Sequence, residues 1–237
     1  MPSRDLDWPG CYNVRDLGHL PAAAGGRTRW GAVVRSDTLD RLTPAGWSAA
    51  AAHGIRTVID LRTDGEHRVG TGFRPDWLTV VPLPLDDPEQ ARQHEFYGTA
   101  LYTRSILERR PQQCAAVLAA LAEARPGGVV VHCVAGRDRT GIIALLLLAL
   151  AGVSPAAVAT DYELSTERLR PLFIRLGEPD EGALSRQRLA REGLTARDVI
   201  LSTLEGFDVE AYLHAAGLGP AELAAVRTRF VQPADRP

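Results

Sequence analysis

From residue 30 to residue 150, short apolar segments alternate with longer amphipathic or alanine-rich stretches. The apolar segments predict buried strands at residues 30–35, 55–61, 78–83 and 129–131. The stretches around them predict helices at residues 43–53, 96–108, 112–124 and 142–150. This alternation predicts an α/β fold, with a central, mostly parallel sheet of four to five strands flanked by helices.

From residue 154 onward, the sequence predicts helices and no strands. Ser154 and Pro155 form an N-cap and a first turn, so a helix begins there, with residues 161–165 toward its end. Residues 166–192 are rich in Arg and Glu and include glycine and proline, which favours a helical insertion or lid. Further helices at residues 196–204, 209–216 and 220–230 would form a C-terminal helical annex. No domain-sized linker interrupts the pattern, so residues 1–237 are expected to form one domain.

The composition is that of a folded domain of ordinary polarity. Of the 237 residues, 45% are hydrophobic and 24% charged, and the net charge is −2. This balance gives no attraction to nucleic acid or to an anionic membrane. The longest apolar run, residues 142–153, is shorter than the about 20 residues that span a bilayer, so no stable membrane insertion is expected.

The cysteines are odd in number and unevenly spaced, at Cys11, Cys114 and Cys133. This pattern indicates neither a disulfide framework nor a zinc site, so we expect no metal and a reducing compartment. Cys11 and Cys114 are expected to be inert packing residues. Residues 1–10 lack the apolar core of a signal peptide, which together with the cysteines favours a cytoplasmic location.

The richest chemistry lies between the strand at 129–131 and the helix at 142–150, in the sequence His-Cys-Val-Ala-Gly-Arg-Asp-Arg-Thr-Gly, residues 132–141. Successive amides of such a turn, followed by a helix N-terminus, form a binding site for oxyanions. A thiol there is driven toward thiolate, the reactive form, and the planar guanidinium of Arg139 can bind two phosphate oxygens. Gly136 allows a backbone conformation closed to other residues, and Thr140 can donate a hydrogen bond to the cysteine sulfur. The residues therefore predict a nucleophilic site for a phosphoryl group that needs no metal or other cofactor.

These residues resemble the signature of the cysteine-dependent protein tyrosine phosphatases, His-Cys-x-x-Gly-x-x-Arg-Thr-Gly. The fuller match is to the bacterial tyrosine/serine phosphatase group, in which the loop reads His-Cys-x-Ala-Gly-Lys-Asp-Arg-Thr-Gly. Shorter motifs outside the loop also resemble family positions, in the family's order: residues 13–18, residues 35–37, residues 60–62 with Glu66, and residues 161–162. The resemblance covers most of the chain and implies a phosphotyrosine phosphatase-like fold.

The resemblance implies a role for each residue of the loop. Cys133 would be the nucleophile that carries a phosphocysteine intermediate, and Arg139 would bind the phosphoryl oxygens. Other loop residues would bind the substrate's phosphate: Val134, Ala135, Gly136, Arg137, Thr140 and Gly141. His132 and Arg62 would support the site.

Two residues leave alternatives open. Asp138 is the first candidate for the general acid, because the resembling group has an aspartate inside the loop. Asp60 is the second candidate, or it is a partner that holds Arg139 or Arg62. Arg137 stands where the group has lysine, so it is either a second contact for an anionic substrate or a solvated loop charge. Since the chain contains no lysine anywhere, this exchange can also reflect composition alone.

Three functions compete at this point. The first is a protein tyrosine phosphatase, acting on phosphotyrosine and also on phosphoserine or phosphothreonine, with a phosphoprotein or phosphopeptide as its partner. The second is a phosphatase of phosphoinositides or small molecules. The third is a phosphate-binding module without catalysis, which the intact pair of Cys133 and Arg139 disfavours, because a binder has no need of a nucleophile.

Overall fold

The computed structural model describes residues 3–67 and 74–234. A five-stranded sheet with the order β1-β3-β6-β4-β5 lies at its centre. Its strands are β1 (Arg15–Asp16), β3 (Val33–Ser36), β4 (Ile55–Asp60), β5 (Thr79–Pro82) and β6 (Gly128–His132). The pairs β3–β6, β6–β4 and β4–β5 are parallel, and only the edge strand β1 is antiparallel to its neighbour. The predicted mostly parallel sheet is confirmed.

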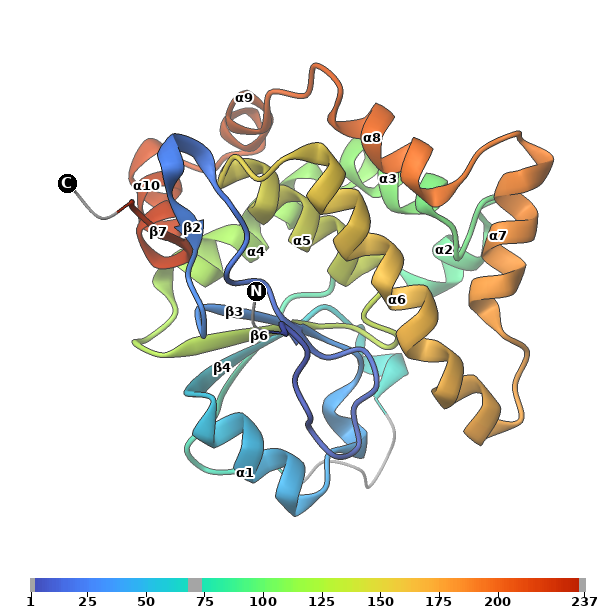
Figure 1. The fold of residues 1–237 in the computed structure, drawn as a ribbon, viewed down its shortest axis with the longest axis horizontal. Coiled ribbons are helices and arrows are strands. Elements are labelled where there is room, and N and C mark those ends of the chain that lie inside the picture. The colour runs from blue at the N-terminus through green and yellow to red at the C-terminus, as the bar shows by residue number, and fades with distance from the viewer. Residues whose placement is uncertain (1–2, 68–73, 235–237) are drawn as a thin grey trace.

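Helices cover both faces of the sheet, as Figure 1 shows. One face packs on α1 (Pro44–Ala52), whose Trp47 is buried against β3, β4 and β6. Thr43 caps this helix by accepting a hydrogen bond from the Gly46 amide, with Pro44 in the first turn. The opposite face packs on α3 (Ala100–Arg109), α4 (Pro111–Glu123) and α5 (Arg139–Leu150). The predicted flanking helices are therefore present on both sides.

The central helix α5 is buried on all sides. Ten of its residues lie in the core, and the run from Ile142 to Leu148 is enclosed throughout. A helix that is hydrophobic on every face must be surrounded by other elements, because exposing any of its faces to water would cost free energy. Its N-terminus is thereby fixed at the carboxyl end of β6, where the loop at residues 133–138 joins the two.

The helical annex begins with α6 (Pro155–Leu176) and continues with α7 (Glu181–Arg191), α8 (Ala196–Leu204), α9 (Val209–Ala215) and α10 (Pro220–Phe230). The expectation that the first of these helices ends soon after residue 165 is wrong. It continues through Pro171, because Leu169, Leu172 and Phe173 bury one face of its second half. Residues 166–192 thus comprise the end of α6 and all of α7, and their motion as a lid stays a prediction.

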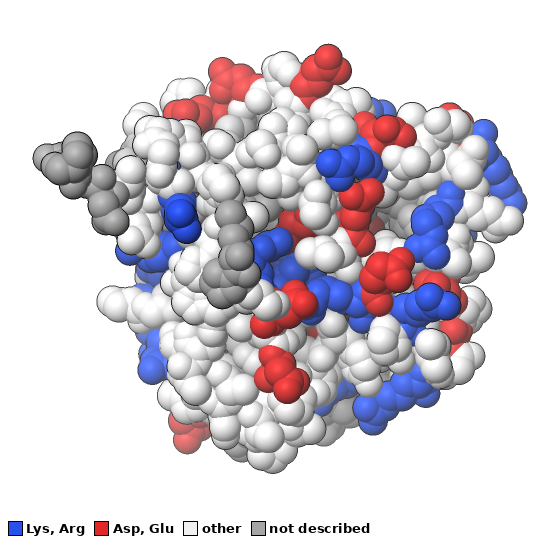
Figure 2. All heavy atoms as spheres, viewed as in Figure 1, with Lys and Arg blue, Asp and Glu red and all other residues white. Residues whose placement is uncertain are grey.

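A second, two-stranded sheet pairs β2 (Arg27–Thr28) with β7 (Val231–Gln232), close to the end of the described chain. No pattern in the sequence predicted this pair. Arginine and acidic side chains are interspersed on the face in Figure 2, and neither sign dominates it. Among the described residues, no helix is both long enough and apolar enough to cross a membrane.

Candidate active site

The loop between β6 and α5 owes its shape to Gly136. This residue has φ of 66°, in the left-handed region that side chains rarely adopt. A Cβ built there would lie only 2.3 Å from the Ser36 carbonyl oxygen of β3. The loop therefore needs glycine for its conformation and for its close approach to the neighbouring strand.

Buried polar side chains hold the loop from behind. Arg35 donates to the Gly136 carbonyl at 2.7 Å, and the Asn13 side-chain amide donates to the Ala135 carbonyl at 2.9 Å. The Asp161 carboxylate of α6 binds Arg15 at 3.0 Å and Arg35 at 2.7 Å. Its pKa is far below its usual range: although burial alone would raise it, these arginines stabilise the carboxylate. The carbonyl oxygens of Ala135 and Gly136 thus point toward the buried side chains of Asn13 and Arg35.

Cys133 follows β6 directly, and its side chain belongs to the lining of a cavity of about 480 Å³. Only 3% of the residue is exposed, so the sulfur lies at the floor of the cavity. Thr140 is buried in the first turn of α5, and its hydroxyl has no hydrogen-bond partner within the described residues. That free hydroxyl leaves the predicted donation to the cysteine sulfur available.

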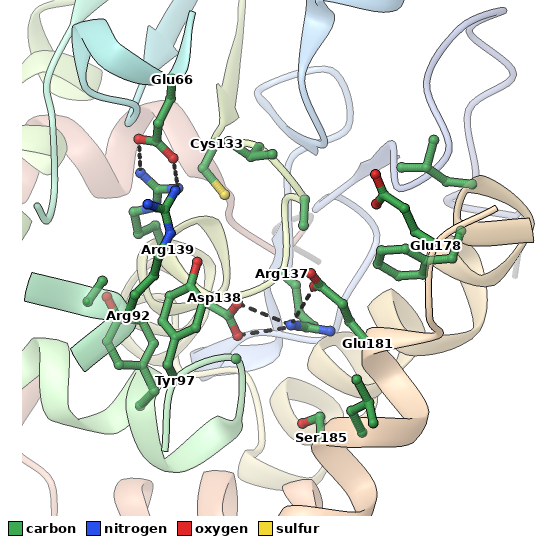
Figure 3. Close-up of a pocket in the computed structure, with 18 of the residues that line it drawn as sticks. Glu66, Arg92, Tyr97, Cys133, Arg137, Asp138, Arg139, Glu178, Glu181 and Ser185 are labelled. Atoms are coloured by element: carbon green, nitrogen blue, oxygen red, sulfur yellow. Dashed lines mark hydrogen bonds and ion pairs between the residues drawn. The ribbon is translucent and has the colours of Figure 1, made fainter. Parts of the chain in front are cut away.

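Arg139 is fixed by two hydrogen bonds to one carboxylate. Its Nη1 and Nη2 each lie 2.6 Å from an oxygen of Glu66 (Figure 3). Burial would lower the pKa of Arg139, but Glu66 and the nearby Cys133 sulfur outweigh burial and raise it. Glu66 is in turn held by the Thr63 amide at 3.0 Å. The guanidinium therefore stays charged beside the thiol, with Glu66 setting its orientation.

Asp138 lies at the edge of the same cavity, on the loop residue just before α5. Its Oδ1 is 3.4 Å from the hydroxyls of both Thr103 and Tyr162, and 3.4 Å from Arg137 Nε. The side chain is 16% exposed, which leaves it accessible to a substrate in the cavity. The structure thus brings together Cys133, Arg139 and Asp138 at one cavity.

Asp60 lies outside the lining of the cavity. Its carboxylate is buried at the end of β4, where Arg62 donates to it at 2.8 and 2.9 Å. Burial would raise the pKa of Asp60, but Arg62 and His132 lower it to about 2. Of the two alternatives for Asp60, the geometry favours the partner that holds Arg62, because a carboxyl that stays ionised is a poor proton donor. It does not contact Arg139, whose carboxylate partner is Glu66.

His132 lies under the loop, fully enclosed. Its Nδ1 donates to the Cys133 carbonyl at 3.0 Å, and its Nε2 is 3.5 Å from Asp60. Burial lowers the pKa of His132 to about 4, against the opposing effect of Asp60. A neutral imidazole thus supports the backbone next to the thiol.

Arg137 is buried and does not behave as a solvated loop charge. Its Nη2 is 3.4 Å from Glu181 of α7 and 3.4 Å from Asp138 (Figure 3). Burial alone would lower the pKa of Arg137, but Asp138, Tyr162 and Glu181 raise it. The side chain therefore links the loop to α7.

Cys11 and Cys114 do not line the cavity. Burial raises the pKa of Cys114 to about 12 and that of Cys11 further, so both remain thiols. Within residues 3–67 and 74–234, no group of three or more His, Cys, Asp or Glu side chains is placed to hold a metal ion.

Several residues at the site were missed by sequence reasoning or given no role. Glu66 belonged to a recognised motif but had no assigned function. Two further residues belong to no motif. Thr103 reaches the site from α3, and Tyr97 reaches it from the connection between α2 (Pro88–Gln93) and α3. Only the tertiary fold brings them to the loop.

Comparisons with known proteins show the family to which this chain belongs. The model of the "Tyrosine phosphatase family" matches residues 6–232. The chain belongs to the tyrosine phosphatase family. It is 31% identical over 213 residues to "Triple specificity protein phosphatase PtpB" of Mycobacterium tuberculosis, covering 75% of this chain and 74% of that protein. It is 29% identical over 225 residues to a "Tyrosine-protein phosphatase" of Nostoc commune, covering 85% and 74%.

Among solved structures, TpbA of P. aeruginosa in complex with phosphotyrosine aligns with a TM-score of 0.40 and 17% identity. The alignment covers 83% of this chain and 93% of that one. The family assignment itself comes from the match along residues 6–232.

Proposed function

We propose that this tyrosine phosphatase family member hydrolyses phosphotyrosine in proteins or peptides through a phosphocysteine intermediate, without a metal. One observation carries the proposal: the Cys133 sulfur lies on a cavity floor beside Arg139, whose guanidinium Glu66 holds with two hydrogen bonds of 2.6 Å. A nucleophile next to a fixed, bidentate phosphate ligand is the arrangement that phosphoryl transfer to sulfur requires.

In the first step, the Cys133 thiolate attacks phosphorus and the bond to the tyrosyl oxygen breaks. Arg139 and the loop amides bind the equatorial oxygens, whose charge develops in the transition state. Asp138 gives its proton to the departing phenolate oxygen, so that tyrosine leaves as the neutral phenol. The products are phosphocysteine, the dephosphorylated tyrosine and the Asp138 carboxylate.

In the second step, water attacks the phosphorus of phosphocysteine, and Asp138 accepts a proton from that water. The sulfur leaves as thiolate, and the free hydroxyl of Thr140 is available to stabilise it by donating a hydrogen bond. Inorganic phosphate then departs, and the enzyme is back in its initial protonation state. Since the nucleophile is a thiolate, the proposal includes a reducing compartment such as the cytoplasm.

The surroundings of Arg137 support phosphotyrosine over a phosphoinositide. Its guanidinium contacts Asp138 and Glu181, so its charge is already matched by the Glu181 carboxylate while Asp138 is protonated. A headgroup with several phosphates would have to compete with Glu181. The relative PtpB is named a triple specificity protein phosphatase, so the substrate panel extends beyond phosphotyrosine.

The test measures kcat/KM of the full chain in the presence of a chelator. The substrates are a phosphotyrosyl peptide, its phosphoseryl and phosphothreonyl counterparts and a phosphoinositide. We expect phosphotyrosine to give the highest kcat/KM, inhibition by vanadate, and a loss of more than about a thousandfold in Cys133→Ser. Cys114→Ser is the matched control, since it changes a buried thiol away from the cavity. Activity of Cys133→Ser at the wild-type level, or a strict need for metal, would refute the proposal.

A further inference from the structure

Exposed hydrophobic side chains gather at the mouth of the catalytic cavity. Across the described residues, six large hydrophobic side chains are exposed, and four of them line this cavity: Tyr97 (37%), Val134 (41%), Leu176 (40%) and Leu184 (42%). Single exposed hydrophobic residues are ordinary on a protein surface, but a cluster around one cavity marks a contact surface.

The four residues come from separate parts of the chain. Tyr97 precedes α3, Val134 belongs to the loop, Leu176 is the last residue of α6, and Leu184 lies in α7. We call Val134, Leu176 and Leu184, together with Tyr97, the apolar rim. The buried Leu172 and Phe173 of α6 also line the cavity and continue the apolar surface inward from the rim.

We infer that the apolar rim binds aliphatic or aromatic side chains that flank the phosphorylated tyrosine of a peptide substrate. This inference rests on the proposed function and adds the substrate's sequence preference. A peptide that places its phosphate between Cys133 and Arg139 must cross the cavity mouth, where its neighbouring side chains meet the rim. Removing apolar surface of both partners from water then contributes binding energy in proportion to the area covered.

The charges around the rim are of both signs. Glu178 and Glu181 lie on the same side of the cavity as α7, opposite Arg92 and Tyr97 (Figure 3). Arg188 of α7 also lines the cavity, so the charges favour neither an acidic nor a basic partner, and its apolar surface is what distinguishes the rim. The headgroup of a phosphoinositide carries hydroxyls and phosphates and offers the rim little apolar surface, since only the acyl chains of the lipid are apolar.

The fold supplies a matched pair of variants. Leu176→Ser/Leu184→Ser removes two rim side chains of α6 and α7, which lie on other elements than Cys133, Asp138 and Arg139. Ile174→Ser is the control, since Ile174 is a large hydrophobic residue of α6 that is 73% exposed and does not line the cavity. Both changes replace exposed leucine or isoleucine with serine in the same helical region.

The experiment measures kcat/KM on two phosphotyrosyl peptides, one with Leu and Phe beside the phosphotyrosine and one with Glu at the same places, and on p-nitrophenyl phosphate. We expect the wild type to prefer the apolar peptide by roughly tenfold or more, and the double variant to lose that preference. Hydrolysis of p-nitrophenyl phosphate should fall much less than hydrolysis of the apolar peptide, because this small substrate has no flanking side chains to contact the rim. Ile174→Ser should behave as the wild type.

Equal kcat/KM for the two peptides in the wild type, with turnover of both, would overturn the inference and leave the proposed function intact. An equal loss of preference in Ile174→Ser would also overturn it. If the double variant instead loses activity on phosphoinositide vesicles and keeps its peptide preference, the rim serves a membrane and the inference fails. Absence of turnover on all phosphotyrosyl substrates would refute the proposed function, and the inference with it.

Discussion

At the scale of single residues, the site combines groups that the sequence places in one loop with groups that only folding brings near. Cys133, Asp138 and Arg139 could be selected from the loop sequence, because a thiol, an acid and a guanidinium before a helix suit phosphoryl transfer. Glu66 could not be given its role in the same way, since its contact with Arg139 spans a long stretch of chain. The pairing of Asp60 with Arg62 likewise became visible only in the structure, and the assignment of the general acid to Asp138 stays a prediction.

The first prediction concerns the general acid. Asp138→Asn should lower kcat on a phosphotyrosyl peptide by about 10²–10³, because a phenolate of ordinary basicity leaves poorly without a proton. On p-nitrophenyl phosphate, whose leaving group is much less basic, the loss should be far smaller. Steady-state kinetics on both substrates measures the difference. Equal losses would count against Asp138, and a selective loss in Asp60→Asn would transfer the role to Asp60.

The second prediction concerns the orientation of Arg139. Glu66→Gln keeps the shape of the side chain but removes the charge that fixes the guanidinium, so kcat/KM should fall by about tenfold or more. Glu178→Gln is the control, because it also neutralises a glutamate of the cavity lining and has no recorded contact with Arg139. If both variants lose the same amount, the effect comes from the charge of the cavity, not from Glu66.

At the scale of elements, the loop depends on β3 behind it and on α6 beside it. The strands β3, β4 and β6 and the helices α1 and α5 could be predicted, because periodicity, caps and apolar runs mark them locally. The length of α6 could not be predicted. Pro171 and the charged composition suggested that the helix ends early, but the burial of Leu169 and Phe173 stabilises its second half. The pair β2–β7 escaped prediction because strands of two residues each have no periodicity to detect.

The third prediction tests the ion pairs that join α6 to the loop. Asp161→Asn leaves the buried guanidinium groups of Arg15 and Arg35 without their carboxylate, which should lower the free energy of unfolding by about 3–5 kcal/mol. Denaturant unfolding measures this change. Asp198→Asn serves for comparison, because Asp198 is the N3 residue of the capping box of α8 on the surface, and its replacement should cost far less. A loss below about 1 kcal/mol for Asp161→Asn would show that these ion pairs do not hold the loop.

At the scale of the whole molecule, one sheet carries the site at the carboxyl ends of its parallel strands, and the annex supplies the cavity's outer wall. A mostly parallel sheet and a site at the carboxyl end of one of its strands could be expected from the alternation of strands and helices, whereas the order of the strands could not. The wall formed by the end of α6 and by α7 could only be named as an insertion, because its packing depends on contacts that leave no local pattern. The same burial that builds the core also makes stability depend on pH.

The fourth prediction follows from His132, which is buried in the neutral form. Burial lowers its pKa from 6.5 to about 4, so between these values the unfolded chain binds a proton that the folded chain does not. This contribution to stability is complete above pH 6.5 and is lost as the pH falls toward 4, by about 3 kcal/mol in all. Unfolding free energies measured from pH 7 to pH 4 should fall more steeply in the wild type than in His132→Gln. Equal slopes would show that His132 is not held neutral.

The central claim is that the phosphoryl group passes through Cys133, and trapping that intermediate tests it most directly. The full chain is mixed with a phosphotyrosyl peptide, quenched in acid within one turnover, digested and analysed by mass spectrometry. We predict a phosphoryl group on the sulfur of Cys133, accumulating further in Asp138→Asn with an activated aryl phosphate, because that variant lacks the base for hydrolysis. Rapid turnover with an unmodified Cys133, or with the phosphoryl group on another residue, would contradict the account.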